Sequence, residues 1–247
     1  MMKSILITGC NRGLGLGLVK SVLKELNPKH VIATCRNVNN AGDLQEVANK
    51  HQNVHILELD VKNIESYPVL VEQVTKIVGD DGLNVLFNNA GVSPRSTRLA
   101  FTEVDKMMDT FLVNTVAPVM LTKAFLPLLK KASSANSELP MGIAKAAIIN
   151  MSSMLGSIAQ NESGGLYPYR CTKAALNAAT KSMSVDLKSD GIIAVNMHPG
   201  WVKTDMGGNK APLDISESVD GIVKTLTKLN EKDNGGFLQY DGKPIPW

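Results

Sequence analysis

The sequence predicts an α/β fold in which helices cover both faces of one doubly wound parallel β-sheet. Short apolar segments alternate with amphipathic helical segments along the chain, which is typical of parallel strands joined by crossover helices. Residues 83–87 are mostly apolar, as expected of a strand that is buried on both faces. A length of 247 residues suits one large α/β domain. We therefore expect a single domain over residues 1–247 with strand order 3-2-1-4-5-6-7.

The first half of the chain alternates between expected strands and helices. Helical spacing of Leu16, Val19 and Leu23 predicts the first helix, and alternating or continuous apolar residues predict the strands. The expected strands are residues 3–8, 30–35, 54–59 and 83–87, and the expected helices are residues 14–26, 41–50 and 64–78.

The second half begins with a long amphipathic helix, expected over residues 102–131. Pro118 and Pro127 should produce kinks or a break near its end. A polar loop is expected at residues 133–142. The remaining strands are expected at residues 146–151, 192–197 and 236–240, with helices starting near Tyr169 and covering residues 216–229.

Composition limits the partners that the chain is expected to have. A net charge of +3 without a basic run argues against nucleic acid. Three cysteines without metal spacing indicate a reducing compartment, and the four histidines show no pairing that suggests a metal site. The apolar run near the N-terminus is too short for a secretion signal or a membrane span. We therefore expect a cytoplasmic protein that binds no nucleic acid, membrane or metal.

A glycine-rich turn lies between the first strand and the first helix. Gly9, Gly13 and Gly15 allow backbone N–H groups and the positive helix end to meet a pyrophosphate. We expect a nucleotide cofactor to contact this whole turn, including Asn11 and Leu14. The alternative is a tight connection without a ligand.

The end of the second strand indicates which nucleotide is bound. An acidic residue there would hold a ribose 2′-hydroxyl, but Cys35 and Arg36 occupy the position. Arg12 lies within the glycine-rich turn, so two guanidinium groups are available for a 2′-phosphate. This combination favours NADP(H) over NAD(H). Either arginine alone has the simpler interpretation of a solvated loop charge.

Two further strand ends are expected to contact the cofactor. Asp60 and Val61 follow the third strand, where Asp60 either caps the next helix or accepts a hydrogen bond from an adenine amino group. Asn88 and Asn89 follow the fourth strand, and their amides are able to brace the sheet edge. The expected cofactor contacts in this second segment are Asn89, Ala90 and Gly91, where the glycine lets the backbone approach a ligand.

Tyr169 is the candidate general acid, and Lys173 is the candidate cation that stabilises its phenolate. Their spacing puts both on one helix face. A tyrosine has a reference pKa near ~10. An ammonium at roughly 5 Å would stabilise the phenolate by about 3 kcal/mol, or roughly two pKa units, which would make the phenol usable near pH ~8. The pair alone is weak evidence, because the same spacing is common on solvated helix faces.

Two other polar positions strengthen this interpretation. Ser152 and Ser153 end the fifth strand at the edge where ligands bind in open α/β sheets, although loop hydroxyls are the simpler explanation. Asn114 lies mid-helix among apolar residues, where an amide is more often structural than catalytic.

The chain resembles the short-chain dehydrogenase/reductase family over essentially its full length. The motifs that carry the resemblance are TGCNRGLG, NNAG, Asn114, Ser153, Tyr169-x-x-x-Lys173 and the Pro199-Gly200 turn. The longer segments ITGCNRGLGLGLVK and HPGWVKTDMGG resemble the sniffer-type carbonyl reductases of that family. The resemblance implies a Rossmann fold, NADP(H), cofactor contacts that extend to Pro199, Gly200, Val202 and Thr204, and a homodimer.

The resemblance also implies a role for each catalytic candidate. Ser153 would position a substrate carbonyl, Tyr169 would be the general acid, and Lys173 would lower its pKa and bind the nicotinamide ribose. Asn114 would support a proton-relay water. We therefore expect NADPH-dependent reduction of an aldehyde, ketone or quinone. The alternatives are an NAD(P)-linked alcohol dehydrogenase and a catalytically idle NADPH-sensing regulator.

One departure from the family pattern concerns the substrate pocket. Ser153 and Tyr169 are 16 residues apart, which is longer than usual, with the extra residues falling at 161–166. This spacing leaves Ser152 as a possible substitute, whereas Tyr167 has Cys171 rather than a lysine four residues on. The pocket is expected to be mainly apolar, with Val92, Met154, Leu155, Leu166, Trp201 and Met206 in or beside its loops.

Overall fold

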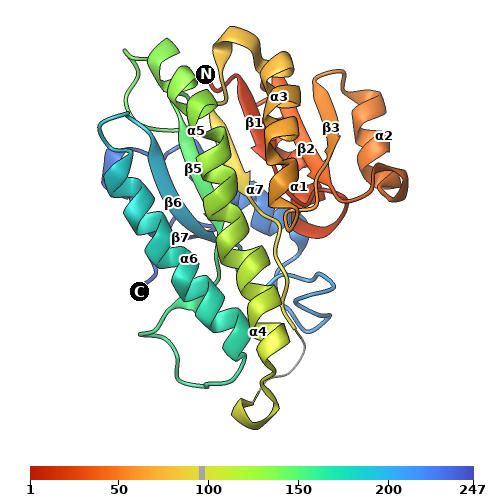
Figure 1. The fold of residues 1–247 in the computed structure, drawn as a ribbon, viewed down its shortest axis with the longest axis vertical. Helices are drawn as coiled ribbons and strands as arrows, with labels where there is room; N and C mark the ends of the chain where they lie inside the picture. Colours follow the sequence, from red (N-terminus) through yellow and green to blue (C-terminus); the bar gives the residue numbers. More distant parts are fainter. Residues whose placement is uncertain (95–97) are drawn as a thin grey trace.

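The computed structural model describes residues 1–94 and 98–247 and contains one seven-stranded sheet. The strands pair in the order β3-β2-β1-β4-β5-β6-β7, and every neighbouring pair is parallel, which confirms the predicted fold (Figure 1). The strands are β1 (Ser4–Ile7), β2 (His30–Cys35), β3 (Val54–Glu58), β4 (Val85–Asn88), β5 (Ala147–Met151), β6 (Ile193–His198) and β7 (Phe237–Gln239).

Two apolar layers hold the helices on opposite faces of the sheet. One layer joins α1 (Gly13–Glu25), α2 (Gly42–Lys50) and α7 (Ile215–Leu226) to the strands. The other joins α3 (Tyr67–Val78), α5 (Ala117–Ala135) and α6 (Tyr167–Asp186). Neighbouring strand residues alternate between the layers: Ile5 and Ile7 pack in the first and Leu6 in the second. Burial on both faces explains the apolar composition of the strands.

The long helix is continuous where kinks or a break were predicted, and it contains a π-helical segment. It runs without a break from α4 (Val104–Phe111) through a π-helical segment (Leu112–Val116) into α5, and it passes Pro127 as helix. Pro118 has no N–H to donate to the Asn114 carbonyl, which favours the wider π turn just before it. The expected loop at residues 133–142 starts later than predicted, because α5 extends to Ala135 and Ser133 is buried.

This same helix is long and apolar enough to cross a membrane by length and composition alone. Half of its most apolar window is buried inside the protein, however. Leu121, Phe125 and Leu129 pack in the second apolar layer with almost no exposure. These contacts are those of a core helix.

A pair of histidines was not anticipated. His30 Nδ1 lies 3.2 Å from His55 Nε2, because both side chains stand on the same side of the adjacent strands β2 and β3. Burial lowers the pKa of both rings. Within residues 1–94 and 98–247, no group of three or more His, Cys, Asp or Glu side chains is placed to hold a metal ion.

Candidate functional site

Two adjoining cavities lie at the carboxyl ends of the strands. The larger has a volume of about 820 Å³ and the smaller about 500 Å³. Both are lined by the same five residues where they meet: Leu14, Asn89, Gly91, Thr204 and Met206. The expected cofactor residues line mainly the smaller cavity. Of the expected catalytic residues, Ser153, Tyr169 and Lys173 line the larger cavity, whereas Asn114 lines neither. This is the edge at which ligands bind in open α/β sheets.

The glycine-rich turn has the close packing that its sequence predicts. Gly9 and Gly13 have φ values of +72° and +57°, which favour glycine, and a Cβ on Gly15 would collide with the Gly9 carbonyl oxygen. Asn89 braces the turn, because its Nδ2 donates to the Thr8 carbonyl at 2.7 Å. The Thr8 hydroxyl accepts from the backbone N–H groups of Asn89 and Ala90, at 3.0 Å and 2.9 Å. The amides after β4 are therefore scaffold for the turn.

The two arginines both line the smaller cavity but have different surroundings. Arg12 forms an exposed ion pair with Asp205, which lies in the loop after β6. Arg36 forms no ion pair with any residue in the described part of the chain. An acidic residue therefore lies beside Arg12, although none stands at the end of β2. Asp205 lies in a segment distant in sequence from Arg12, and no local sequence pattern predicts the contact between them.

Asp60 and Val61 also line the smaller cavity. Asp60 Oδ1 accepts from the Lys62 backbone N–H at 3.0 Å, which is a local turn. The N-cap position of the following short helix is Asn63, whose side chain makes no capping hydrogen bond. The helix-cap interpretation of Asp60 is therefore wrong. The carboxylate lies at the cavity wall, where the interpretation as a hydrogen-bond acceptor for a ligand requires it.

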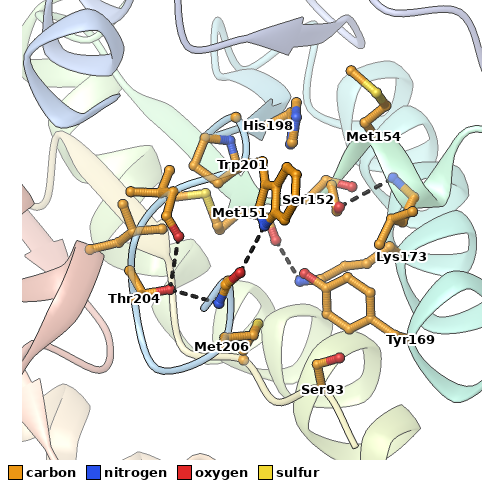
Figure 2. Close-up of a pocket in the computed structure, with 18 of the residues that line it drawn as sticks. Ser93, Met151, Ser152, Met154, Tyr169, Lys173, His198, Trp201, Thr204 and Met206 are labelled. Atoms are coloured by element: carbon orange, nitrogen blue, oxygen red, sulfur yellow. Dashed lines mark hydrogen bonds between the residues drawn. The ribbon is translucent and has the colours of Figure 1, made fainter. Parts of the chain in front are cut away.

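Tyr169 and Lys173 lie one turn apart at the start of α6, and both face the larger cavity (Figure 2). The Lys173 side chain is buried, and its Nζ donates to the Met151 carbonyl at 2.7 Å. The same Nζ lies 5.6 Å from the centroid of the Tyr169 ring. The predicted pairing on one helix face thus brings ammonium and phenol to the same cavity wall.

The pKa of the phenol differs from the sequence-based expectation. Burial raises the pKa of Tyr169, and its hydrogen bond with Ser153 lowers it only in part. Burial also lowers the pKa of Lys173 to about 8. The ammonium is itself destabilised by burial and is directed to the Met151 carbonyl. Burial of the phenol therefore outweighs the stabilisation of the phenolate by Lys173, and the pKa of Tyr169 is raised rather than lowered as expected.

Ser152 and Ser153 have different partners. Ser152 is fully buried, and its hydroxyl donates to Asn177 Oδ1 at 2.6 Å. Ser153 accepts from the Leu155 backbone N–H at 3.2 Å, and its hydroxyl is near enough to the Tyr169 phenol to lower the pKa of that group. Ser153 is therefore the serine whose hydroxyl lies beside the Tyr169 phenol.

We expect Ser153→Ala to lower kcat/KM for a carbonyl substrate by about 10²-fold, because it removes a donor to the reacting oxygen. Ser152→Ala should retain most of the activity and lose thermal stability, because it leaves the buried Asn177 amide short of a partner. Steady-state kinetics and thermal melting of the two variants separate these effects. The opposite ranking of activities would show that the longer segment before Tyr169 has shifted the register.

Asn114 is fully buried in the π-helical segment. Its Oδ1 accepts from the Val92 N–H at 2.9 Å, and its Nδ2 donates to the Val92 carbonyl at 2.8 Å. The side chain thus fixes the loop after β4, in agreement with the structural role expected from sequence. The proton-relay role that the family resemblance implies for Asn114 stays a prediction.

The long segment between Ser153 and Tyr169 is held by a residue that sequence reasoning missed. Arg170 is nearly buried and donates to the Gly164 carbonyl at 3.2 Å and the Ser163 hydroxyl at 2.8 Å. Gly164, Gly165 and Leu166 all have positive φ, which turns the chain sharply into α6. The extra residues therefore form a braced loop, and Tyr169 stays opposite Ser153.

The loop after β6 covers the larger cavity. Pro199, Gly200, Val202 and Thr204, the cofactor contacts that the family resemblance implies, line this cavity, and of the four only Thr204 also lines the smaller cavity. Trp201 Nε1 donates to the Gly207 carbonyl at 2.8 Å, and the Thr204 hydroxyl accepts from the Gly207 N–H at 3.1 Å, which shapes this loop (Figure 2). Of the expected apolar residues, only Val92 is misplaced, since it lines the smaller cavity.

The fold and this pair of cavities are those of a nucleotide-dependent oxidoreductase, and a family comparison agrees. The model of the short chain dehydrogenase family matches residues 3–213, which include all the expected catalytic and cofactor residues. The chain therefore belongs to the short chain dehydrogenase family.

Individual proteins of known structure or sequence are similar to this chain over nearly its full length. The structure of carbonyl reductase Sniffer of D. melanogaster is 56% identical, covers 100% of both chains and has a TM-score of 0.99. The NADPH bound carbonyl reductase from chicken fatty liver is 42% identical, with 100% of this chain and 99% of that chain covered and a TM-score of 0.94. An uncharacterised oxidoreductase of Schizosaccharomyces pombe is 32% identical over 99% of this chain and 98% of its own length.

Proposed function

We propose that this protein is an NADPH-dependent carbonyl reductase that reduces an aldehyde, ketone or quinone, with Tyr169 as the general acid. The observation that carries the proposal is the meeting of Ser153, Tyr169 and Lys173 in one cavity that adjoins the glycine-rich turn. The names of the D. melanogaster and chicken relatives support the same activity.

The residues of the smaller cavity fit a dinucleotide. Gly13 and Gly15 lie in the first turn of α1 and have no side chain, which lets a pyrophosphate approach the helix N-terminus. Gly91 leaves space beside Lys173, since a Cβ there would lie 3.7 Å from the lysine Nζ. Arg12 and Arg36 would hold a 2′-phosphate, and Asp60 would accept from the adenine amino group.

In this mechanism the bound nicotinamide supplies a hydride to the carbonyl carbon. The Ser153 hydroxyl orients the carbonyl oxygen, and the Tyr169 phenol gives that oxygen its proton. Lys173 holds the nicotinamide ribose and keeps its ammonium near the phenol, where it stabilises the phenolate that the proton transfer leaves. Trp201, Met154 and Leu166 line the same cavity and limit the access of water.

The two alternative functions are less well supported. An NAD-linked alcohol dehydrogenase would need an acid at the end of β2, where Arg36 stands. A catalytically idle NADPH-sensing regulator would be free to lose the serine, tyrosine or lysine, yet all three are present and share one cavity. Incubation of the purified protein with NADPH and a panel of carbonyl compounds, followed by nicotinamide absorbance, tests the proposal. No turnover across the panel would favour the regulator.

We also propose that the protein is cytoplasmic and forms an isologous homodimer through α4 and α6. Ala174, Ala175, Ala178 and Ala179 on α6 permit the close approach of another helix, and none of them is fully buried. Val104 and Met108 on α4 are 76% and 66% exposed. An exposed apolar helix face of this kind is typical of a protein interface.

Sedimentation of the protein at micromolar concentration should therefore give a dimer. Ala178→Glu should give a monomer, because a charge would be buried at the helix contact. Lys20→Glu on α1, outside the proposed interface, serves as the control and should leave the dimer intact. A monomeric wild-type protein would overturn this proposal.

A further inference from the structure

His30 and His55 form a pair of imidazoles at the end of the sheet opposite to the two cavities. His30 is the first residue of β2 and His55 the second residue of β3, so both lie at the amino ends of their strands. The register pairs Ile32 with His55, and residues two apart on a strand point to the same side, so His30 and His55 share one face. Ile32 packs in the second apolar layer, which is the layer that holds α3.

The two rings meet through one nitrogen each. His30 Nδ1 lies 3.2 Å from His55 Nε2, while the ring centroids are 5.3 Å apart, so these two nitrogens are turned toward each other. Imidazole nitrogens that bind one ion at about 2.0–2.1 Å are about 2.9 Å apart at a right angle and about 3.3 Å apart at a tetrahedral angle. The observed spacing lies between these two values.

The same spacing also suits an N–H···N hydrogen bond, in which one of the two facing nitrogens carries a proton. A neutral imidazole can carry its single proton on either nitrogen. An ion therefore takes the place of that proton when the proton moves to the other nitrogen of the same ring. Binding requires no large movement of the strands, because both rings are already in place.

The surroundings keep both rings neutral, which is the form that binds metals. Burial lowers the pKa of both, and the nearby charges of His55 and Lys29 lower the pKa of His30 further. Asp81 acts in the opposite direction on His30. Its two carboxylate oxygens, however, accept from Lys3 at 2.7 Å and from Lys29 at 2.9 Å. The pair is therefore uncharged at physiological pH.

The ligand set indicates which ions fit. Imidazole suits copper, nickel and zinc, whereas calcium and magnesium prefer oxygen ligands. Both side chains are half-buried, so a hydrated ion can reach them from solvent. In the part of the chain that the structure describes, no third His, Cys, Asp or Glu joins them. Water would complete the coordination, and the affinity should be weaker than that of a site with three or four protein ligands.

We propose that His30 and His55 bind one divalent ion of copper, nickel or zinc at the amino ends of β2 and β3. The ion joins β3, which is the edge strand, to β2 (Figure 1). This differs from the expectation that the chain binds no metal, because the two histidines are 25 positions apart and meet only through strand pairing. The inference is independent of the proposed reductase function.

Calorimetric titration of the full-length protein with Zn²⁺ tests the site. Wild type should bind one ion with a micromolar Kd. His30→Phe and His55→Phe each remove one ligand and should weaken binding by at least about ten-fold, since the loss of a group that merely supports a ligand already costs that much. His51→Phe, at an exposed position after α2, is the matched control and should bind as wild type does. Cys171→Ser, which removes the exposed thiol, should also bind normally.

Thermal melting gives a second measurement that reports folding directly. Zn²⁺ should raise the melting temperature of wild type and of His51→Phe, but not that of His30→Phe or His55→Phe. If neither of the last two variants folds, the electron paramagnetic resonance spectrum of Cu²⁺ bound to wild type decides, and it should show coupling to two nitrogens. Absence of binding by wild type, unchanged binding in both variants of the pair, loss of binding in Cys171→Ser, or coupling to fewer than two nitrogens would overturn the inference.

Discussion

Replacing Tyr169 with phenylalanine should lower kcat/KM for a carbonyl substrate by at least about 10²-fold, the usual effect of a lost general acid. The phenylalanine ring retains the apolar contacts of the tyrosine but cannot donate a proton to the developing alkoxide. The cavity and the glycine-rich turn do not depend on the hydroxyl, so NADPH affinity should stay close to that of wild type. Steady-state kinetics and a fluorescence titration with NADPH measure the two quantities separately.

Tyr167→Phe is the matched control for this experiment. Tyr167 lies in the same helical turn, but the residue four positions on is Cys171 rather than lysine. The control should keep normal activity. Near-normal turnover in Tyr169→Phe, or an equal loss in the two variants, would refute the assignment of the general acid.

Changing Arg36 to aspartate should strongly weaken NADPH binding and shift the preference toward NADH. A 2′-phosphate carries nearly two negative charges. Each charge-assisted hydrogen bond to it is worth about 1.5–3 kcal/mol, so even one of them gives a preference of about ten-fold or more. The aspartate would repel the phosphate and accept from the bare 2′-hydroxyl of NADH. The ratio of kcat/KM for the two cofactors measures the shift.

Arg12 should retain part of the original preference. Its ion pair with Asp205 is exposed on both sides, and such pairs contribute only about 0–1 kcal/mol. A phosphate therefore competes successfully for the Arg12 guanidinium. Lys20→Asp, which introduces a negative charge on the exposed side of α1, should leave the cofactor preference unchanged. Equal use of NADH and NADPH by the wild-type protein would show that both arginines are only solvated loop charges.

Features determined by local sequence could be predicted. The apolar pattern of the strands indicated their positions, because parallel strands buried on both faces leave little choice of residue. The sheet order followed from the doubly wound fold that was expected for these strands. The glycine-rich turn was equally predictable, since Gly9 and Gly13 need positive φ and Gly15 needs close packing. The spacing of Tyr169 and Lys173 placed both on one helix face, and in the structure that face forms part of a cavity wall.

Features that depend on contacts between distant segments could not be predicted. The Arg12–Asp205 pair, the Arg170 brace and the His30–His55 pair each join residues for which the chain carries no shared local pattern. The predicted direction of the Tyr169 pKa shift was wrong for the same reason. Spacing gives the distance between phenol and ammonium, but desolvation depends on the whole wall around them.

The central claim is that a hydride passes from the nicotinamide of NADPH to a carbonyl carbon in the cavity that holds Tyr169. The direct measurement uses NADPH that carries deuterium at the transferable position, together with a reducible aldehyde, and analyses the alcohol by mass spectrometry and NMR. We expect one deuterium on the carbinol carbon, delivered from one face of the nicotinamide only. Oxidation of NADPH without deuterium in the alcohol, or label from both faces, would contradict direct transfer in this site.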